Sequence, residues 1–202
     1  MTKGEQTRQF IIMKSAELFN QRGFAGSSLS DITLATGIKK GGLYRHFTSK
    51  DEIAVEAYNY ASQVVGGKFA AAIEQETTAY DKLMAYFHVY KNVTNEPPFI
   101  GGCPMQNTAV ECDDAHPLLR LKAQESSSAT LKSIREIVQD GINSGEFRSD
   151  LDPDAVASFT LSLLEGSIML SKLEGTNNHM QLNLANYSNY LKMFCLKDHP
   201  PA

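Results

Sequence analysis

The residues best suited to bind a charged partner are concentrated in one short segment, residues 28–50. This segment reads SLSDITLATGIKKGGLYRHFTSK. Its lysine side chains can neutralise phosphate groups, and its arginine can donate a pair of hydrogen bonds to guanine. Residues 1–50 hold eight Lys/Arg against three Asp/Glu, although the formal net charge of the whole chain is −4. A basic head on an acidic body indicates a protein that places one end against DNA, and the alternative is a basic solvated face without a partner.

A second group of reactive side chains lies around Cys103-Pro104, which follows two glycines. A cysteine at the entry of a helix lies near the positive end of the helix dipole, which favours the thiolate. Cys112 is nine residues further on, and a helix between the two sulfurs would separate them by about 13 Å, too far for a disulfide. The alternative for Cys103 is a small buried side chain at a tight turn. Three cysteines, an odd number, indicate a reducing compartment rather than a disulfide framework.

Helices must position both groups, because apolar residues recur at helical spacing and no segment alternates like a strand. Ile12, Ala16 and Phe19 form the apolar stripe of a first helix, which Gly23 ends. A second helix begins at residues 28–31, where a serine and an aspartate three residues later can form a capping box.

Gly37 ends the second helix after about two turns, and a third helix is expected from Lys39 to near Phe47. Two short helices joined at a glycine bury little surface alone, so they should pack on the first helix as a three-helix unit. The shared core of this unit is expected to contain Ile32, Ile38, Leu43 and Phe47. In this geometry the second helix directs its N-terminal amides at a phosphate, and the third helix lies in the major groove.

The rest of the chain is predicted to be helical as well. A fourth helix begins near Lys50 and meets Gly66-Gly67, where two adjacent glycines indicate a bend or a flexible joint. Further helices are expected over residues 79–95, 104–112, 117–143, 153–174 and 180–196. The helix over residues 153–174 is apolar on nearly all sides and should be buried.

The helix-turn-helix segment contains Ile32-Thr33, Thr36-Gly37-Ile38, Lys39-Lys40-Gly41-Gly42, Leu43-Tyr44-Arg45-His46-Phe47 and Ser49-Lys50-Asp51. This pattern resembles the TetR family of repressors over about the first quarter of the chain. It departs from the usual pattern at Thr33, Thr36 and Lys39, where alanine, alanine and serine are common. The resemblance implies an all-α protein with a three-helix helix-turn-helix DNA-binding domain at residues 1–50 and a helical ligand-binding and dimerisation domain at residues 51–202.

The resemblance also implies which residues contact DNA. Contacts to the phosphate backbone are expected of Ser28, Lys40, Gly41, Tyr44, His46 and Lys50. Contacts to base edges are expected of Lys39, Gly42 and Arg45. The alternative for Tyr44 and His46 is that they only cap and pack the small domain.

The second domain is expected to carry the sensor and the dimer interface. An apolar ligand pocket could be lined by Phe69, Phe87, Tyr90, Met105, Phe159 and Met169, although such residues form an ordinary core equally well. In the resembled family the two final helices pair with their twins in a four-helix interface, and the alternative is an internal core. A subset of TetR-like repressors that respond to electrophiles carries a similar Gly-Cys and a later lysine. By this resemblance, Cys103 assisted by Lys172 is expected to be modified and to release DNA.

The sequence lacks the signatures of an enzyme: HExxH, Gly-x-Ser-x-Gly, a phosphate-binding loop and Cys-x-x-Cys are all missing. His88, His116, His179 and His199 are not at ligand spacing, so no metal and no other cofactor is expected. No apolar run approaches the roughly 18 residues of a membrane span, and no signal peptide is visible.

These observations predict a cytoplasmic DNA-binding regulator, most commonly a repressor in the resembled family. It is expected to dimerise on a palindromic operator and to be released by a small molecule or by cysteine modification. Two alternatives stay open. Sensing could rest on non-covalent binding of an apolar ligand without cysteine chemistry, and the chain could be a helical small-molecule-binding protein or an enzyme with an incidental basic head.

Overall fold

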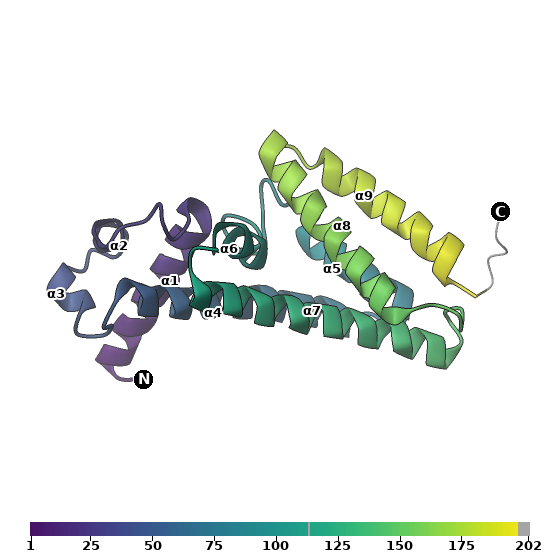
Figure 1. The fold of residues 1–202 in the computed structure, drawn as a ribbon, viewed down its shortest axis with the longest axis horizontal. Coiled ribbons are helices and arrows are strands. Elements are labelled where there is room, and N and C mark those ends of the chain that lie inside the picture. The colour runs from purple at the N-terminus through teal and green to yellow at the C-terminus, as the bar shows by residue number, and fades with distance from the viewer. Residues whose placement is uncertain (113, 198–202) are drawn as a thin grey trace. The chain divides into compact units, whose positions relative to one another are not determined.

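The computed structural model describes residues 1–112 and 114–197. The described residues form an all-α fold without a strand, apart from one isolated bridge between Phe147 and Leu196. The helices, labelled in Figure 1, are α1 (Lys3–Arg22), α2 (Leu29–Thr36), α3 (Lys40–Leu43), α4 (Lys50–Glu74), α5 (Ala79–Tyr90), α6 (Pro104–Cys112), α7 (Pro117–Ser144), α8 (Pro153–Glu174) and α9 (Asn178–Tyr190), followed by a π-helical turn, Leu191–Cys195. The expected fold class is confirmed.

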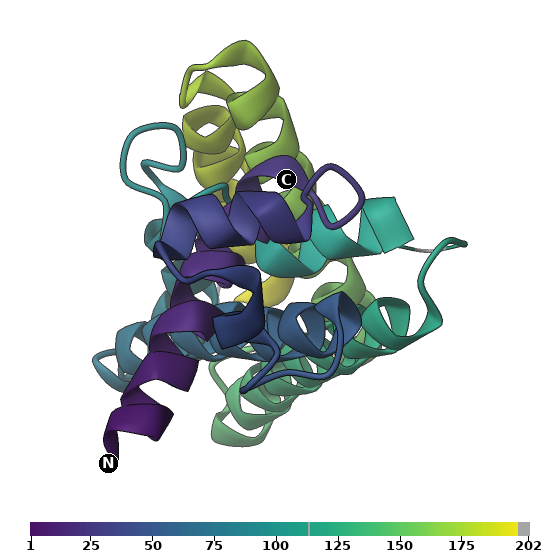
Figure 2. The ribbon, with the colours of Figure 1, turned by 90° about the vertical axis from the view of Figure 1, so that its left-hand side faces the viewer.

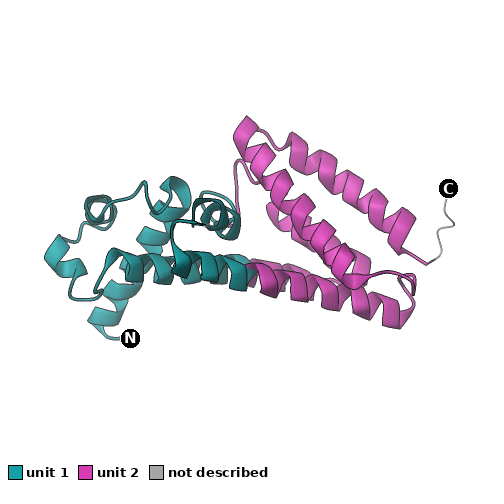
Figure 3. Cartoon of the chain, viewed as in Figure 1, with its two compact units in different colours: residues 1–65, 99–126 teal, residues 66–98, 127–202 magenta. Residues whose placement is uncertain are grey.

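The chain divides into two compact units, which Figure 3 shows in different colours. Unit 1 contains Met1–Val65 and Phe99–Ser126, and unit 2 contains Gly66–Pro98 and Ser127–Ala202. Helices α4 and α7 each contribute residues to both units. The boundary predicted at residue 50 stays a prediction, since residues 51–65 and 99–126 have most of their contacts with the N-terminal helices.

The N-terminal part of unit 1 is the expected three-helix arrangement, in which α2 packs on α1 and α3 on α2 (Figure 2). Its apolar core consists of Ile11, Ile12, Ile32, Leu43, Phe47 and Ile53. Ile38 is partly buried and packs against this cluster, so the four core residues expected from the sequence are confirmed. Full burial of one such side chain contributes about 1.5–3 kcal/mol, which lets helices as short as α2 and α3 hold their positions.

Helix α2 is capped at both ends by residues close to it in the sequence. Ser28 Oγ accepts a hydrogen bond from the Asp31 N–H at 3.2 Å, and Asp31 Oδ2 accepts one from the Ser28 N–H at 2.7 Å, which completes the expected capping box. Gly37 ends α2 in the left-handed region at φ 69°, where glycine has no steric penalty.

Helix α3 is shorter than expected and ends at Leu43 rather than near Phe47. The N–H groups of Arg45 and His46 bond three residues back, to the carbonyls of Gly42 and Leu43, which is the tighter pattern of a helix end. The adjacent glycines at positions 41 and 42 lower helix propensity here.

Helix α4 keeps its helical conformation through Gly66 and Gly67. Each glycine inside a helix costs about 0.5–1 kcal/mol relative to alanine, which the burial of residues such as Ile53 and Tyr58 along the helix offsets. The helix is therefore not interrupted at the glycine pair, and a hinge there stays a prediction.

Unit 2 is organised around α8 and α9, which lie side by side (Figure 1). In its core, Phe87 stacks on Tyr187 with ring centroids 4.6 Å apart, and the Tyr187 hydroxyl and Thr160 Oγ1 are 2.7 Å apart. Ser171 Oγ accepts from the Met180 N–H at 3.0 Å. The buried hydroxyls of Thr160, Ser171 and Tyr187 thus have hydrogen-bond partners within the protein.

Among the described residues, α8 is the one helix long and apolar enough to cross a membrane by length and composition alone. The sequence analysis found no uninterrupted apolar run of this length. The average hydropathy of α8 is nevertheless high, because the polar residues that interrupt its apolar run are few. The buried hydroxyls of Thr160, Ser167 and Ser171, together with the packing of α8 on α9, are typical of the core helix of a soluble protein.

Candidate nucleic-acid interface

Most of the residues predicted to contact DNA lie on the exposed surface of unit 1, on α3 and on its flanks. The exposed ones are Ser28, Lys39, Lys40, Gly41, Tyr44 and Arg45, and the half-buried ones are Gly42, His46 and Lys50. The N-cap of α2, helix α3 with the turn after it, and the start of α4 contribute these residues. The Tyr44 side chain is notable for an aromatic residue because 49% of it is exposed.

The charges on this surface are not neutralised by neighbouring acids. Within residues 1–112 and 114–197, no ion pair involves Lys39, Lys40 or Arg45. By contrast, Arg8 and Lys14 in α1 pair with nearby glutamates at 3.0 and 2.8 Å. The Lys40 ammonium lies 5.9 Å from the centre of the Tyr44 ring. An ammonium and a phenol hydroxyl side by side can both donate to phosphate oxygens.

The two glycines of α3 have different surroundings. A Cβ added to Gly41 would meet nothing within 4 Å, so the packing of the protein itself does not require glycine there. A Cβ added to Gly42 would lie 2.7 Å from Ile38 Cγ2. The side-chain direction of Gly42 therefore faces Ile38, and its small size serves the packing of the turn. The expected contact of Gly42 to a base edge stays a prediction.

Lys50 is placed differently from the other predicted phosphate contacts. Its ammonium donates a hydrogen bond to the Phe24 carbonyl and lies 3.9 Å from the centre of the Phe24 ring. Desolvation by burial lowers the pKa of Lys50, while the carboxylates of Asp51 and Glu111 act in the opposite direction. In this structure Lys50 therefore fixes the turn between α1 and α2 and does not face outward with Lys39 and Lys40.

One acid, Asp31, lies at the N-terminus of α2 within this basic surface. The hydrogen bond from the Ser28 hydroxyl is the main cause that holds the pKa of Asp31 below its usual value, with a smaller effect of Arg22. The carboxylate therefore stays ionised and accepts the Ser28 N–H, while the Asp31 N–H donates to Ser28 Oγ. Fewer amides than expected are left at this helix end for a phosphate.

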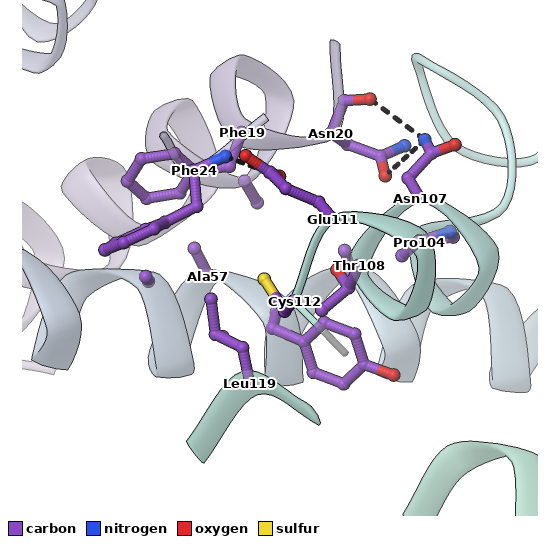
Figure 4. A pocket seen from close by; sticks show the side chains of 14 residues that line it. Phe19, Asn20, Phe24, Ala57, Pro104, Asn107, Thr108, Glu111, Cys112 and Leu119 are labelled. Carbon is purple, nitrogen blue, oxygen red and sulfur yellow. Dashed lines mark hydrogen bonds between the residues drawn. The ribbon is translucent and has the colours of Figure 1, made fainter. Parts of the chain in front are cut away.

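Sequence reasoning missed the polar side chains of α6 that contact the turn between α1 and α2. The Glu111 carboxylate accepts from the backbone of residues 24 and 25, and Asn107 donates to Asn20 (Figure 4). The partner groups are largely backbone atoms, which leave no pattern in the sequence. The only signal was Gly101-Gly102, a pair of glycines where the chain passes close to another backbone.

The candidate sensor residues are divided between the two units. Cys103 is only 4% exposed and lies in unit 1, and its sulfur accepts from the Gln106 N–H at 3.5 Å at the start of α6. Lys172 lies in unit 2, in the last turn of α8. Unit 1 also contains a cavity of about 30 Å³ beside Cys112, Phe24 and Leu119 (Figure 4), which has room for a water molecule or two.

The aromatic and methionine candidates separate into three groups. Phe69, Phe87 and Tyr90 belong to the aromatic interior of unit 2, where the Phe69 and Tyr90 ring centroids are 5.8 Å apart. Met105 is half-buried in unit 1. Phe159 and Met169 are 42% and 49% exposed on α8, so neither lines a closed pocket within this chain, which corrects the sequence expectation for these two residues.

Within residues 1–112 and 114–197, no three His, Cys, Asp or Glu side chains are grouped so that they could hold a metal ion. His88, His116 and His179 lie in separate elements, α5, the α6–α7 connection and α9. His199 lies outside the described residues.

The exposed basic surface on a three-helix head, joined to a larger helical unit, defines a helix-turn-helix DNA-binding regulator. Family comparisons agree with this class. Residues 11–57 match the family of bacterial regulatory proteins named tetR, and residues 79–186 match the tetracyclin repressor-like C-terminal domain.

Individual relatives support the same assignment. The HTH-type transcriptional repressor DhaR of Mycobacterium sp. (strain GP1) is 26% identical over 83% of each chain. A TetR transcriptional regulator from Chloroflexus aurantiacus J-10-FL is 36% identical with a TM-score of 0.94, over 97% of this chain and 99% of that one. A TetR-family regulator from Cytophaga hutchinsonii is 33% identical with a TM-score of 0.92, over 98% and 99%. The chain therefore belongs to the TetR family of transcriptional regulators, whose members bind DNA and are not enzymes.

Proposed function

We propose that this protein is a homodimeric repressor that binds a palindromic operator with α2 and α3 of each protomer. The observation that supports this most directly is the unneutralised cationic surface formed by Lys39, Lys40 and Arg45 on exposed residues around α3. Binding sites for phosphate must be accessible and positively charged, and this surface meets both requirements. The charge of the remaining 152 residues, 11 Lys/Arg against 20 Asp/Glu, repels DNA from the rest of the protein.

In this proposal the residues around α3 have two roles. Lys40 and Tyr44, together with the main chain at Gly41, contact phosphates, and Ser28 and His46 extend this contact on either side. Lys39 and Arg45 contact base edges in the major groove, where an arginine bound to guanine through two hydrogen bonds is the most discriminating contact. Gly42 and Lys50 shape the surface from within, as their packing against Ile38 and Phe24 indicates.

The dimer interface is proposed on the exposed apolar face of α8 and α9. Large apolar side chains that are exposed there include Phe159, Met169, Leu173 and Leu182, and Met193 is exposed in the π-helical turn that follows α9. On α8 these residues are spaced by 10 and 4 positions, so they lie on one side of the helix. A dimer has two reading heads, each formed by α1, α2 and α3 of one protomer. Both heads are needed to reach successive major grooves about 34 Å apart, and a two-fold interface through this face would supply the second head.

Release from DNA is proposed to occur by one of two modes. In the covalent mode an electrophile or oxidant modifies Cys103, whose sulfur lies at the N-terminus of α6 and accepts the Gln106 N–H, an environment that favours the thiolate. In the non-covalent mode a small apolar ligand binds among the aromatic side chains of unit 2, and the burial of Cys103 favours this mode. A cytoplasmic location belongs to the same proposal, and the DNA target and the three free cysteines support it.

Operator binding is tested with fluorescence anisotropy of the full-length protein on labelled DNA from upstream of its own gene and on a scrambled duplex, across a salt series. We expect a preference of at least ~10³-fold for the native duplex and a steep decrease of affinity with salt. Weak, equal and salt-indifferent binding to both duplexes, and to duplexes enriched from a random library, would contradict the proposal and favour a helical ligand-binding protein.

The covalent mode predicts that N-ethylmaleimide modifies Cys103 in the native protein and weakens operator binding. The thiolate adds to the alkene carbon of the reagent, a C–S bond forms, and the resulting carbanion takes a proton from water. Cys195 is an internal control, because burial raises its pKa to about 11 and leaves it a poor nucleophile at neutral pH. Mass spectrometry after brief treatment measures the label, and Cys103→Ser should abolish the effect on DNA binding. An unlabelled Cys103 would leave the non-covalent mode.

A further inference from the structure

The turn between α1 and α2, residues 23–28, is fastened to α6 by side chains of α6 itself. We propose that Glu111 and Asn107 form a latch that holds this turn, and with it the start of α2, in the position required for DNA binding. A shift of α6, or of the loop that carries Cys103, would then act directly on the reading head. This inference deepens the regulation in the proposed function and rests on the head being the DNA-binding surface.

Glu111 forms the first part of the latch. Its two carboxylate oxygens accept hydrogen bonds from consecutive backbone amides, Phe24 N–H to Oε2 and Ala25 N–H to Oε1, both at 2.8 Å. The turn approaches the carboxylate so closely that a Cβ on Gly23 would lie 2.7 Å from Oε1. A carboxylate that accepts two N–H groups forms charge-assisted bonds, which are stronger than neutral ones, and Figure 4 shows the side chain reaching from α6 to the turn.

Asn107 forms the second part, one helical turn before Glu111. Its Nδ2 is 3.0 Å from three acceptors: the Asn20 carbonyl, Asn20 Oδ1 and the Gly101 carbonyl. Asn20 in turn donates to the carbonyls of Ile100 at 2.6 Å and Gly102 at 3.1 Å. The backbone of Gly101 has φ +90°, and a Cβ there would collide with the Asn20 carbonyl. The end of α1 and the loop before Cys103 are therefore bound closely to each other, with no room for a side chain at Gly101.

The same turn is held from its other side by residues of α4 and of the α6–α7 connection. The Lys50 ammonium donates to the Phe24 carbonyl. The His116 ring meets the Phe24 ring edge-on with centroids 4.7 Å apart, and His116 Nε2 is 3.6 Å from Asp51. Phe24 is thus contacted by Lys50 and His116 as well as by Glu111 of α6.

The polar bonds of the latch lie beside a small cavity. The cavity of about 30 Å³ is lined by Phe24, Glu111, Cys112 and Leu119, and Phe24 also packs against the apolar cluster that contains Cys112 and Leu119. Apolar contacts are not directional, whereas the hydrogen bonds of Glu111 and Asn107 are directional and fix the turn in one position. Since the N-cap of α2, Ser28, is four residues after Phe24, opening would free Ser28 and the surface that α2 and α3 present.

The latch is tested with Glu111→Gln and the matched variant Glu125→Gln, which removes a carboxylate paired with Lys122 on α7 of the same unit. A glutamine side chain keeps one acceptor and turns an N–H₂ group toward the second backbone amide. We expect hydrogen exchange of a peptide spanning residues 23–28 to be ~10-fold faster or more in Glu111→Gln, and the rate in Glu125→Gln to equal that of wild type. Equal exchange in all three proteins would overturn the latch.

The effect of the latch on DNA binding is measured in the same proteins by fluorescence anisotropy. The DNA is an operator duplex obtained by selection from random sequences, and the titrations are run with and without N-ethylmaleimide. Glu111→Gln should bind the untreated duplex more weakly than Glu125→Gln and should lose most of the additional weakening on treatment. Asn107→Asp, which places a carboxylate against three carbonyl-type oxygens, should behave like Glu111→Gln. If treatment leaves wild-type binding unchanged while Glu111→Gln loosens the turn and weakens binding, the latch stands and the covalent sensing mode fails. Weakened binding equal in Glu111→Gln and Glu125→Gln would overturn the latch.

Discussion

Met169→Glu is expected to convert the dimer into monomers and to lower operator affinity by ~10³-fold or more. Met169 is 49% exposed on the apolar face of α8, so the folded monomer can accept a charge there at little cost. In a two-fold interface, however, each dimer would bury two such carboxylates without partners, and an unpaired buried charge costs several kcal/mol. A single reading head then loses the second half-site of the operator.

The matched control is Leu118→Glu, because Leu118 is a comparably exposed leucine, 57% exposed, on α7 in unit 1. Light scattering after size exclusion should show a dimer for wild type and for the control and a monomer for Met169→Glu. Thermal unfolding of all three proteins verifies that the fold is intact. A dimer of unchanged stability in Met169→Glu would place the interface elsewhere.

The parts of the fold that the sequence predicted correctly depend on neighbours in the chain. The capping box of Ser28 and Asp31 and the left-handed Gly37 involve groups within a few residues of one another, so the local sequence contains both partners. The core of the three-helix head followed from helical periodicity for the same reason. The likeness to a known family then supplied the order of the domains.

The candidate site was predicted less completely because it also depends on tertiary contacts. A lysine at the start of a helix could equally have faced outward, and only the approach of Phe24 shows that Lys50 folds back. The direction of a missing side chain at Gly42 is set by Ile38 in the folded turn. The role of Glu111 depends on backbone amides 86 or 87 residues earlier in the chain, a separation that no periodicity or motif spans.

The division into units changes how the head is understood. Residues 99–126 belong with the N-terminal helices, so Cys103 and α6 lie in the unit that carries the reading head rather than in the unit with α8 and α9. A signal at Cys103 would therefore have a short route to the turn before α2, through contacts of Asn20 with the loop at residues 100–102.

Arg45→Ala is expected to reduce the preference for the operator over a scrambled duplex by ~10²-fold or more. An arginine bound to guanine through two hydrogen bonds contributes about 1–3 kcal/mol of discrimination, and a dimer has two copies of it. Arg45 is exposed and outside the ion pairs of the described residues, so its loss should leave the stability of the head unchanged. Anisotropy titrations on both duplexes measure the ratio of the two affinities.

Lys40→Ala provides the contrast that separates base contacts from phosphate contacts. Lys40 lies beside Tyr44 on the same surface, and loss of a phosphate contact weakens all sequences alike. It also lowers the slope of log affinity against log salt by about 1 per contact removed. The preference ratio should therefore fall in Arg45→Ala and stay constant in Lys40→Ala, while the salt slope of Lys40→Ala decreases. The reverse pattern would assign the base contact to Lys40 and would require α3 to lie in the groove in a different orientation, because Lys40 begins α3 and Arg45 follows its end.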